Sequence, residues 1–185
     1  MFNKTDFENI IWDFLFTYRQ FLLNGYLHKR VNSDVYEKNS STWNALLLSL
    51  ESGAMLGLAK LLERRNDIGR PFDNFTGTTF DNKDFDSKEL NKIANKILNL
   101  RHAYIAHADL SKMRNMNSFL NKNRLSGTEG VKIFDALKGR LIQYQKNLKF
   151  NIDVQKLFTE SQNNALNDID DWLKSFRAEL KGKTI

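Results

Sequence analysis

The sequence STWNALLLSLESGAMLGLAKLL, residues 41–62, decides the fold class. Its apolar side chains recur at three- and four-residue spacing and cover most of the circumference of a helix, so we expect this helix at the centre of the core. Gly53 and Gly57 lie four residues apart on one helix face. Each costs about 1 kcal/mol of helix propensity relative to alanine, which predicts that another helix backbone approaches them closely. That helix could belong to the same chain or to a second copy across a dimer interface.

The segments around this helix also have helical periodicity. Thr5-Asp6-Phe7-Glu8 has the pattern of a capping box, and the helix it starts is expected to end near Asn24-Gly25. A third helix carries the apolar stripe from Leu90 to Ile105, and Ser111–Gly127 is expected to be a loop or a short helix. A fourth helix is expected from Thr128, with a buried stripe made of Val131, Phe134, Leu137, Leu141, Tyr144 and Leu148.

A last helix is expected from about residue 153 to residue 180, with a break near residues 162–164. Residues 66–85, which hold the single proline, have no clear helical period and are expected to form a long loop. We find no alternating strand pattern and no internal repeat. The chain is therefore predicted to be one domain, residues 1–185, with an all-α fold: an antiparallel bundle of four or five long helices.

Composition limits the class of protein further. The chain has 185 residues, one proline and nine glycines, which favours long helices, and it has no cysteine, so disulfides and thiolate metal sites are excluded. The start of the sequence does not have the pattern of a secretory signal. Asn44, Glu51 and Lys60 interrupt the most apolar segment, which argues against a membrane span of roughly 18 or more apolar residues. We expect a soluble, cytoplasmic protein with no membrane partner.

Positive charge is concentrated in one part of the chain. Residues 101–149 contain ten Lys or Arg and three acidic residues, a net charge of +7, while the remainder holds 18 basic and 19 acidic residues. Such asymmetry indicates an anionic partner, with RNA as the leading candidate, although a solvated basic face has the same composition. The residues expected to hold an RNA strand are Lys112, Arg114, Lys122, Arg124, Lys132 and Arg140.

The stretch from Leu100 to Asp109, LRHAYIAHAD, has the richest chemistry in the chain, because two of its three histidines lie there. Cleavage of RNA without a metal needs a base, an acid and a cation near the phosphate. Histidine can supply either proton transfer, and arginine binds phosphate oxygens with its planar fork. Arg101, His107 and His102 are therefore the candidate catalytic residues. Tyr104 and Asp109 are expected to support them.

The spacing of the motif does not fit a single ideal helix. Six residues at about 100° each leave Arg101 and His107 roughly 120° apart and about 9 Å apart along the axis. A bent helix or a second copy of the chain would bring them together. The alternative is a structural role, in which the histidines lie near the helix dipole and the arginine pairs with an acid.

Other chemistries find less support in the sequence. His102 and His107 are five residues apart, whereas two zinc ligands on one helical face are four apart, so no metal site is expected. The chain has no phosphate-binding glycine loop, no serine nucleophile elbow and no cysteine nucleophile. We expect no cofactor.

The motif Arg101-His102-Ala103-Tyr104-Ile105-Ala106-His107 resembles that of HEPN domains, which are α-helical bundles with an arginine, a polar residue and a histidine a few positions on. The chain is most similar to the branch linked to phage abortive infection (AbiU-like proteins), in which a helix rich in tryptophan and leucine precedes the motif. Trp43 to Leu62 is similar to that helix. The resemblance covers residues 1 to 150 in helix order.

The resemblance implies a metal-independent endoribonuclease of the toxin or phage-defence type, acting as a homodimer with a composite site. Arg101 would bind the scissile phosphate, His107 would be the acid or base, and His102 would occupy the supporting polar position. It also implies an antitoxin or nucleotidyltransferase partner. Toxins regulated by a nucleotidyltransferase often carry a tyrosine just after the motif histidine, whereas this chain has Ala108-Asp109. The alternative is a non-catalytic HEPN module that binds RNA, a nucleotide or a partner protein.

Overall fold

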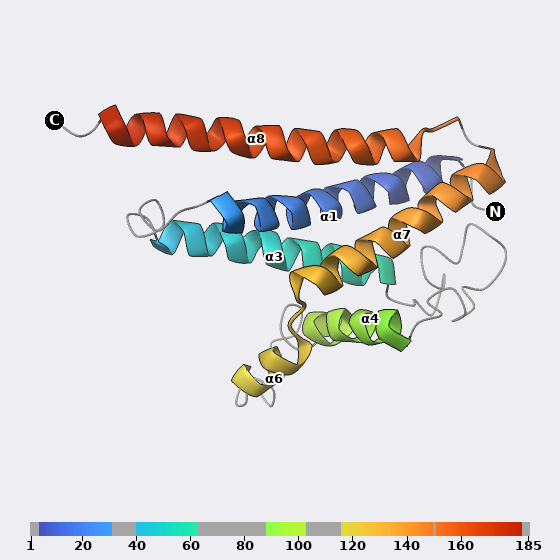
Figure 1. Ribbon diagram of the computed structural model, residues 1–185. Helices are drawn as coiled ribbons and strands as arrows, with labels where there is room; N and C mark the ends of the chain where they lie inside the picture. Colours follow the sequence, from blue (N-terminus) through green and yellow to red (C-terminus); the bar gives the residue numbers. More distant parts are fainter. Residues whose placement is uncertain (1–3, 31–39, 63–87, 103–115, 150, 183–185) are drawn as a thin grey trace.

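The computed structural model describes residues 4–30, 40–62, 88–102, 116–149 and 151–182 (Figure 1). Four long helices make up most of this part of the chain: α1 (Lys4–Arg30), α3 (Ser40–Leu62), α7 (Gly127–Leu148) and α8 (Val154–Gly182). Two shorter helices, α4 (Lys88–Leu100) and α6 (Met116–Asn123), lie between α3 and α7 in the sequence. The described residues contain no strand, so the predicted all-α bundle is confirmed.

Helix α1 is the central element, because α3 packs along one side of it and α8 along the other (Figure 1). Helix α3 runs antiparallel to α1, since Lys60 pairs with Asp13 while Leu47 accepts a hydrogen bond from Asn24. Helix α8 runs parallel to α1: the ring of Phe14 lies 5.0 Å from that of Phe158, and further along Arg30 pairs with Asp170. Helix α7 crosses this layer and contacts α1, α4 and α8.

The main hydrophobic core is shared by α1, α3, α4, α7 and α8. Its fully buried large side chains include Phe14, Leu58, Ile97, Phe134 and Phe158. A second, smaller cluster lies where the end of α1 meets the start of α3 and the later part of α8. Its buried members are Leu27, Trp43, Leu47, Ile169 and Leu173.

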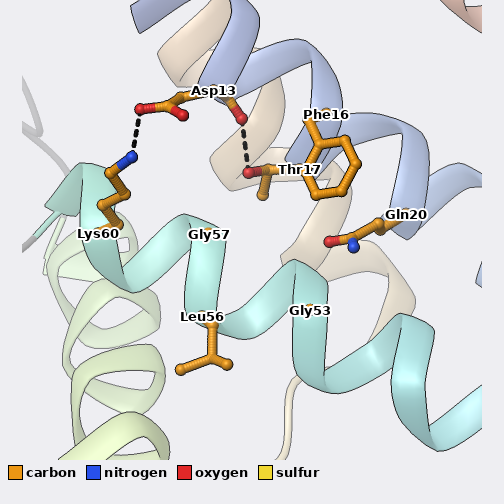
Figure 2. A pocket seen from close by; sticks show the side chains of 8 residues that line it. All are labelled: Asp13, Phe16, Thr17, Gln20, Gly53, Leu56, Gly57 and Lys60. Atoms are coloured by element: carbon orange, nitrogen blue, oxygen red, sulfur yellow. Dashed lines mark hydrogen bonds and ion pairs between the residues drawn. The ribbon is translucent and has the colours of Figure 1, made fainter.

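The approach predicted at the two glycines of α3 occurs within the chain. A Cβ atom added at Gly57 would overlap the side chain of Thr17 on α1, and one added at Gly53 would lie 2.6 Å from the amide of Gln20 (Figure 2). The absence of side chains at the two glycines lets α1 pack closely against α3. This packing offsets the free energy that each glycine costs in a helix. Of the described helices, α3 is also the one long and apolar enough to cross a membrane by length and composition, a test that buried core helices pass as well.

One expected helix end, one expected helix break and one expected buried position were wrong. Helix α1 does not end near Asn24-Gly25 but continues to Arg30, because Asn24 donates to the backbone of α3 and Leu27 is buried in the second cluster. Helix α8 is continuous through residues 162–164. Val131, expected in the buried stripe of α7, is 49% exposed, and Ile133 is buried instead. The expected loop at residues 66–85 lies outside the described residues.

Candidate functional site

The candidate site begins where α4 ends. Arg101 and His102 follow Leu100 in a wider, π-type turn, with Arg101 partly exposed and His102 exposed. The Nη1 atom of Arg101 lies 3.4 Å from Nδ1 of His102. A π-type turn bonds each residue to the fifth one along the chain rather than the fourth, and such turns are frequent at functional sites. Because the turn is wider, residues in it rotate by less than the 100° per residue of an ideal helix.

The remaining predicted residues of the motif and the first two predicted RNA contacts cannot be placed. Tyr104, His107, Asp109, Lys112 and Arg114 all lie outside the described residues. Of the predicted catalytic residues, the described part of the chain contains Arg101 and His102, whose side chains lie side by side.

An amide pair connects the end of α4 to the end of α6. Asn99 Nδ2 donates to Asn123 Oδ1 at 3.2 Å, and Asn123 Nδ2 donates to the carbonyl of Phe119 at 2.9 Å. Asn123 is only 4% exposed, whereas its neighbours Lys122 and Arg124 are exposed. Because Asn99, which is exposed, precedes Arg101 by two residues, this hydrogen bond joins the start of the motif to the end of α6, where the two exposed cations lie.

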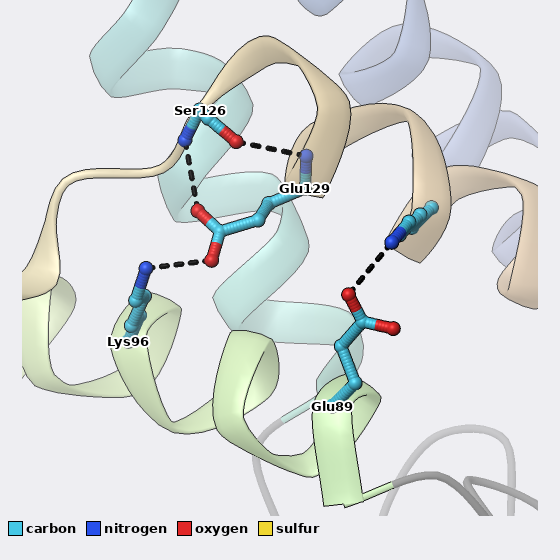
Figure 3. A network of polar contacts seen from close by, with 5 residues as sticks. Glu89, Lys96, Ser126 and Glu129 are labelled. Carbon is cyan, nitrogen blue, oxygen red and sulfur yellow. Dashed lines mark hydrogen bonds and ion pairs between the residues drawn. The ribbon is translucent and has the colours of Figure 1, made fainter.

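A polar network fixes α4 against the start of α7 (Figure 3). Glu129 accepts from Lys96 Nζ at 2.6 Å and from the backbone N–H of Ser126 at 2.9 Å, and the Ser126 hydroxyl accepts from the backbone N–H of Glu129. The hydrogen bond from Lys96, together with that from Ser126, lowers the pKa of Glu129 from its ordinary value. Ser126 and Glu129 form a capping box that satisfies backbone donors at the start of α7.

The two predicted RNA contacts on α7 have different environments. Lys132 is exposed and pairs with Glu89 of α4 at 2.6 Å, so its charge is partly neutralised. Arg140 was expected to contact RNA at the surface, but its side chain is buried in the fold, with the residue only 9% exposed. Arg140 lies three residues after Leu137 and directly before Leu141, both of which are fully buried. The buried face of α7 is therefore wide enough to include Arg140. A buried guanidinium does not fit a surface contact to a strand.

The network and the amide pair were not predicted as parts of the site. Ser126-Gly127-Thr128-Glu129 matches the sequence signature of a capping box, so this helix start could have been found from the sequence alone. Asn99 and Asn123 are 24 residues apart and no local pattern connects them. Within the described ranges, no three or more His, Asp or Glu side chains lie close enough together to hold a metal ion.

No protein-family model matches the chain, and no curated protein and no solved structure matches it either.

Proposed function

We propose that this protein is a metal-independent endoribonuclease of the toxin or phage-defence type, acting as a dimer with a composite Arg101–His107 site. The observation that carries the proposal is the Asn99–Asn123 hydrogen bond, which joins the end of α4 to the end of α6. Arg101 follows Asn99 by two residues, and the exposed Lys122 and Arg124 flank Asn123. An arginine, an imidazole and two further cations in one region match the needs of a phosphodiester substrate.

The proposed reaction is attack of the RNA 2′-hydroxyl oxygen on the adjacent phosphorus. One imidazole removes the 2′ proton, the bond from phosphorus to the 5′ oxygen breaks, and an acid donates a proton to that leaving oxygen. Arg101 would stabilise the extra negative charge on the phosphorane, as preorganised cations do in phosphoryl transfer. The products are a 2′,3′-cyclic phosphate and a 5′-hydroxyl end. His107 is the proposed proton-transfer residue, and His102 supports Arg101.

The charge distribution supports an RNA substrate. Residues 101–149 carry a net charge of +7, and the rest of the chain is close to neutral. A phosphate backbone is attracted to such a region whatever its base sequence. The ion pair with Glu89 engages one of these cations, Lys132, and Arg140 is buried. We assign the strand to Lys122 and Arg124, which are exposed on either side of Asn123.

The proposal is tested by incubating purified protein with single-stranded RNA in EDTA and identifying the ends of the products. His107→Ala is expected to reduce cleavage by about 10²–10⁴-fold, as loss of a general acid or base does. Arg101→Ala is expected to reduce it by about 10²–10³-fold through loss of transition-state stabilisation. His28→Ala is the matched control, because His28 is the third histidine and lies in the last turn of α1. Unchanged cleavage by His107→Ala would refute the assignment.

The second candidate is a non-catalytic module that binds RNA, a nucleotide or a partner protein. The exposure of Lys122 and Arg124 favours it as much as it favours cleavage, since both functions need a cationic surface. It predicts salt-sensitive RNA binding without a cleaved product. If the wild-type protein binds RNA but yields neither a 2′,3′-cyclic phosphate end nor a 5′-hydroxyl end, this second candidate is the correct one.

A further inference from the structure

The face formed by α1 and α3 away from the core contains an open hollow. It has a volume of about 370 Å³ and lies between the two helices, with Gly53 and Gly57 in its lining (Figure 2). Phe16 of α1 and Leu56 of α3 also line it, and Asp13 pairs with Lys60 at one end at 2.6 Å. These residues lie on helices far from the motif in sequence, and the proposed reaction does not use them.

Large apolar side chains project from this face into solvent. Trp12 is 61% exposed and Phe16 is 67% exposed, and they are four residues apart, so they form one ridge along α1 with Gln20. Leu56 is 41% exposed and Leu48, two turns earlier on α3, is 61% exposed. The hollow therefore lies between a ridge with four-residue spacing on α1 and a second such ridge on α3.

This arrangement is self-complementary. A groove between two ridges accepts a ridge of the same spacing from another helix, which is the commonest way in which helices pack. The Trp12–Phe16–Gln20 ridge is such a ridge. In a two-fold assembly each copy presents the same face, so the ridge of one copy can enter the hollow of the other, and the reverse contact follows by symmetry. We propose that a second copy of this chain docks on the α1–α3 face through this ridge.

Area and charge both favour a second copy as the occupant. Buried aromatic side chains contribute about 150–250 Å² each, so the exposed parts of Trp12 and Phe16 offer roughly 250 Å² per copy, about a third of the ~800 Å² that each partner buries in a standard interface. The two leucines add to this area. The charged residues lining the hollow, Asp13 and Lys60, neutralise each other. Two copies with a formal net charge of +6 each can therefore meet here without local repulsion.

An unmatched polar atom lies on the same face. The Oε1 atom of Gln20 is buried and has no hydrogen-bond partner in the part of the chain that the structure describes. Its amide rests against Gly53, where no side chain competes for the space. Rotation of the amide turns this acceptor toward the hollow, where a donor from the second copy can reach it. A buried acceptor without a partner costs free energy that such a contact recovers.

The inference deepens the proposed function, which requires a dimer, by assigning the face that forms it. Oligomeric state tests this face, whereas RNA cleavage in EDTA tests the proposed function separately. Sedimentation of the full chain over a range of concentrations is expected to give a dimer. Phe16→Glu and Trp12→Glu are expected to weaken the dimer by roughly 30-fold or more, the effect of losing a central aromatic contact. Val131→Glu is the matched control, since Val131 is 49% exposed but belongs to α7. A wild-type monomer at all concentrations, or a dimer that tolerates both substitutions, would overturn the proposal.

Cross-linking gives a second readout that needs no charged substitution. The chain has no cysteine, so a single introduced cysteine can form a disulfide only with a second copy. Trp12→Cys, Phe16→Cys and Gln20→Cys sample the ridge, and at least one is expected to form a disulfide-linked dimer faster than Val131→Cys. Disulfides need Cα atoms within about 7 Å, so the reactive position also locates the two-fold axis. If none of the three reacts faster than Val131→Cys, the ridge is not at the dimer interface.

Discussion

Replacing Glu129 with alanine removes two stabilising interactions from the junction of α4 and α7. The carboxylate accepts from Ser126 N–H in the capping box and from Lys96 across the two helices. The substitution removes the Glu129 half of the capping box, while the Ser126 hydroxyl keeps its backbone donor, and this loss costs about 1 kcal/mol. The ion pair is more enclosed than a surface pair, with side chains 18% and 23% exposed, so its loss costs about 0.5–1 kcal/mol. The expected destabilisation is about 1.5–2 kcal/mol.

For a chain of this length, each kcal/mol lowers the melting temperature by about 2–4 °C, so Glu129→Ala is expected to melt about 3–8 °C lower. Thermal unfolding followed by circular dichroism measures this shift. Glu89→Ala is the matched control. It removes the neighbouring ion pair with Lys132, whose side chains are 57% and 47% exposed, and it removes no cap. Its expected cost is less than about 1 kcal/mol. A Glu129→Ala variant that melts with the wild type, or with Glu89→Ala, would refute the reasoning.

The same residue predicts a pH dependence. Because the pKa of Glu129 is lower in the folded protein than its ordinary value of 4.5, the unfolded chain binds the proton more readily. The stabilisation is therefore fully present above about pH 4.5 and is lost as the pH falls through the lowered pKa. The difference in melting temperature between wild type and Glu129→Gln is expected to be constant near neutral pH and to shrink in acid. A difference that grows in acid would contradict this sign.

Three further predictions concern residues of α3, α6 and α7. Gly57→Ala is expected to destabilise the protein by about 1–3 kcal/mol, because its Cβ would overlap Thr17. Gly139→Ala has open space at Cβ and is expected to stabilise the protein by about 0.5–1 kcal/mol. Chemical denaturation measures the free energy of unfolding of both variants. Arg140→Ala is expected to lower the melting temperature, since the side chain is buried, and equal stability of this variant and the wild type would show that burial to be unimportant. Lys122→Ala is expected to leave the melting temperature unchanged but to weaken RNA binding, because Lys122 is exposed. The slope of the logarithm of the binding constant against the logarithm of salt concentration is expected to fall by about one, the effect of losing one phosphate contact. Fluorescence anisotropy in rising salt measures both the affinity and this slope.

The helical fold was predictable because the apolar spacing in this chain is regular. The stripe in α4 could be inferred from three- and four-residue periodicity alone. The central position expected for α3 was wrong, because α1 packs between α3 and α8, and Leu48 and Leu56 of α3 are exposed. Errors arose where contacts distant in sequence overrode local signals. Asn24-Gly25 has the composition of a helix end, but the hydrogen bond from Asn24 to Leu47 and the burial of Leu27 extend α1 by one more turn and a half.

The candidate site was only partly predictable. The arginine and histidine at the end of α4 were found because their side chains are chemically distinctive. The exposure of Lys122 and the burial of Arg140 could not be distinguished by residue type, since burial depends on which face of a helix meets its neighbours. The Asn99–Asn123 contact depends on how α4 and α6 meet in three dimensions, which periodicity does not determine. The self-complementary face of α1 and α3 has the same origin.

The parallel pairing of α1 with α8 has a consequence for synthesis of the chain. Phe14 and Tyr18, made early, have ring contacts with Phe158 of the last helix at 5.0 Å and 6.3 Å between centroids. Phe158 is therefore absent while the chain from α1 to α7 is being translated. Because a helix that lacks its packing partners is only marginally stable in water, α1 must wait with an uncovered apolar side until α8 leaves the ribosome. Folding of this bundle is thus completed only once α8 is available to pack along α1.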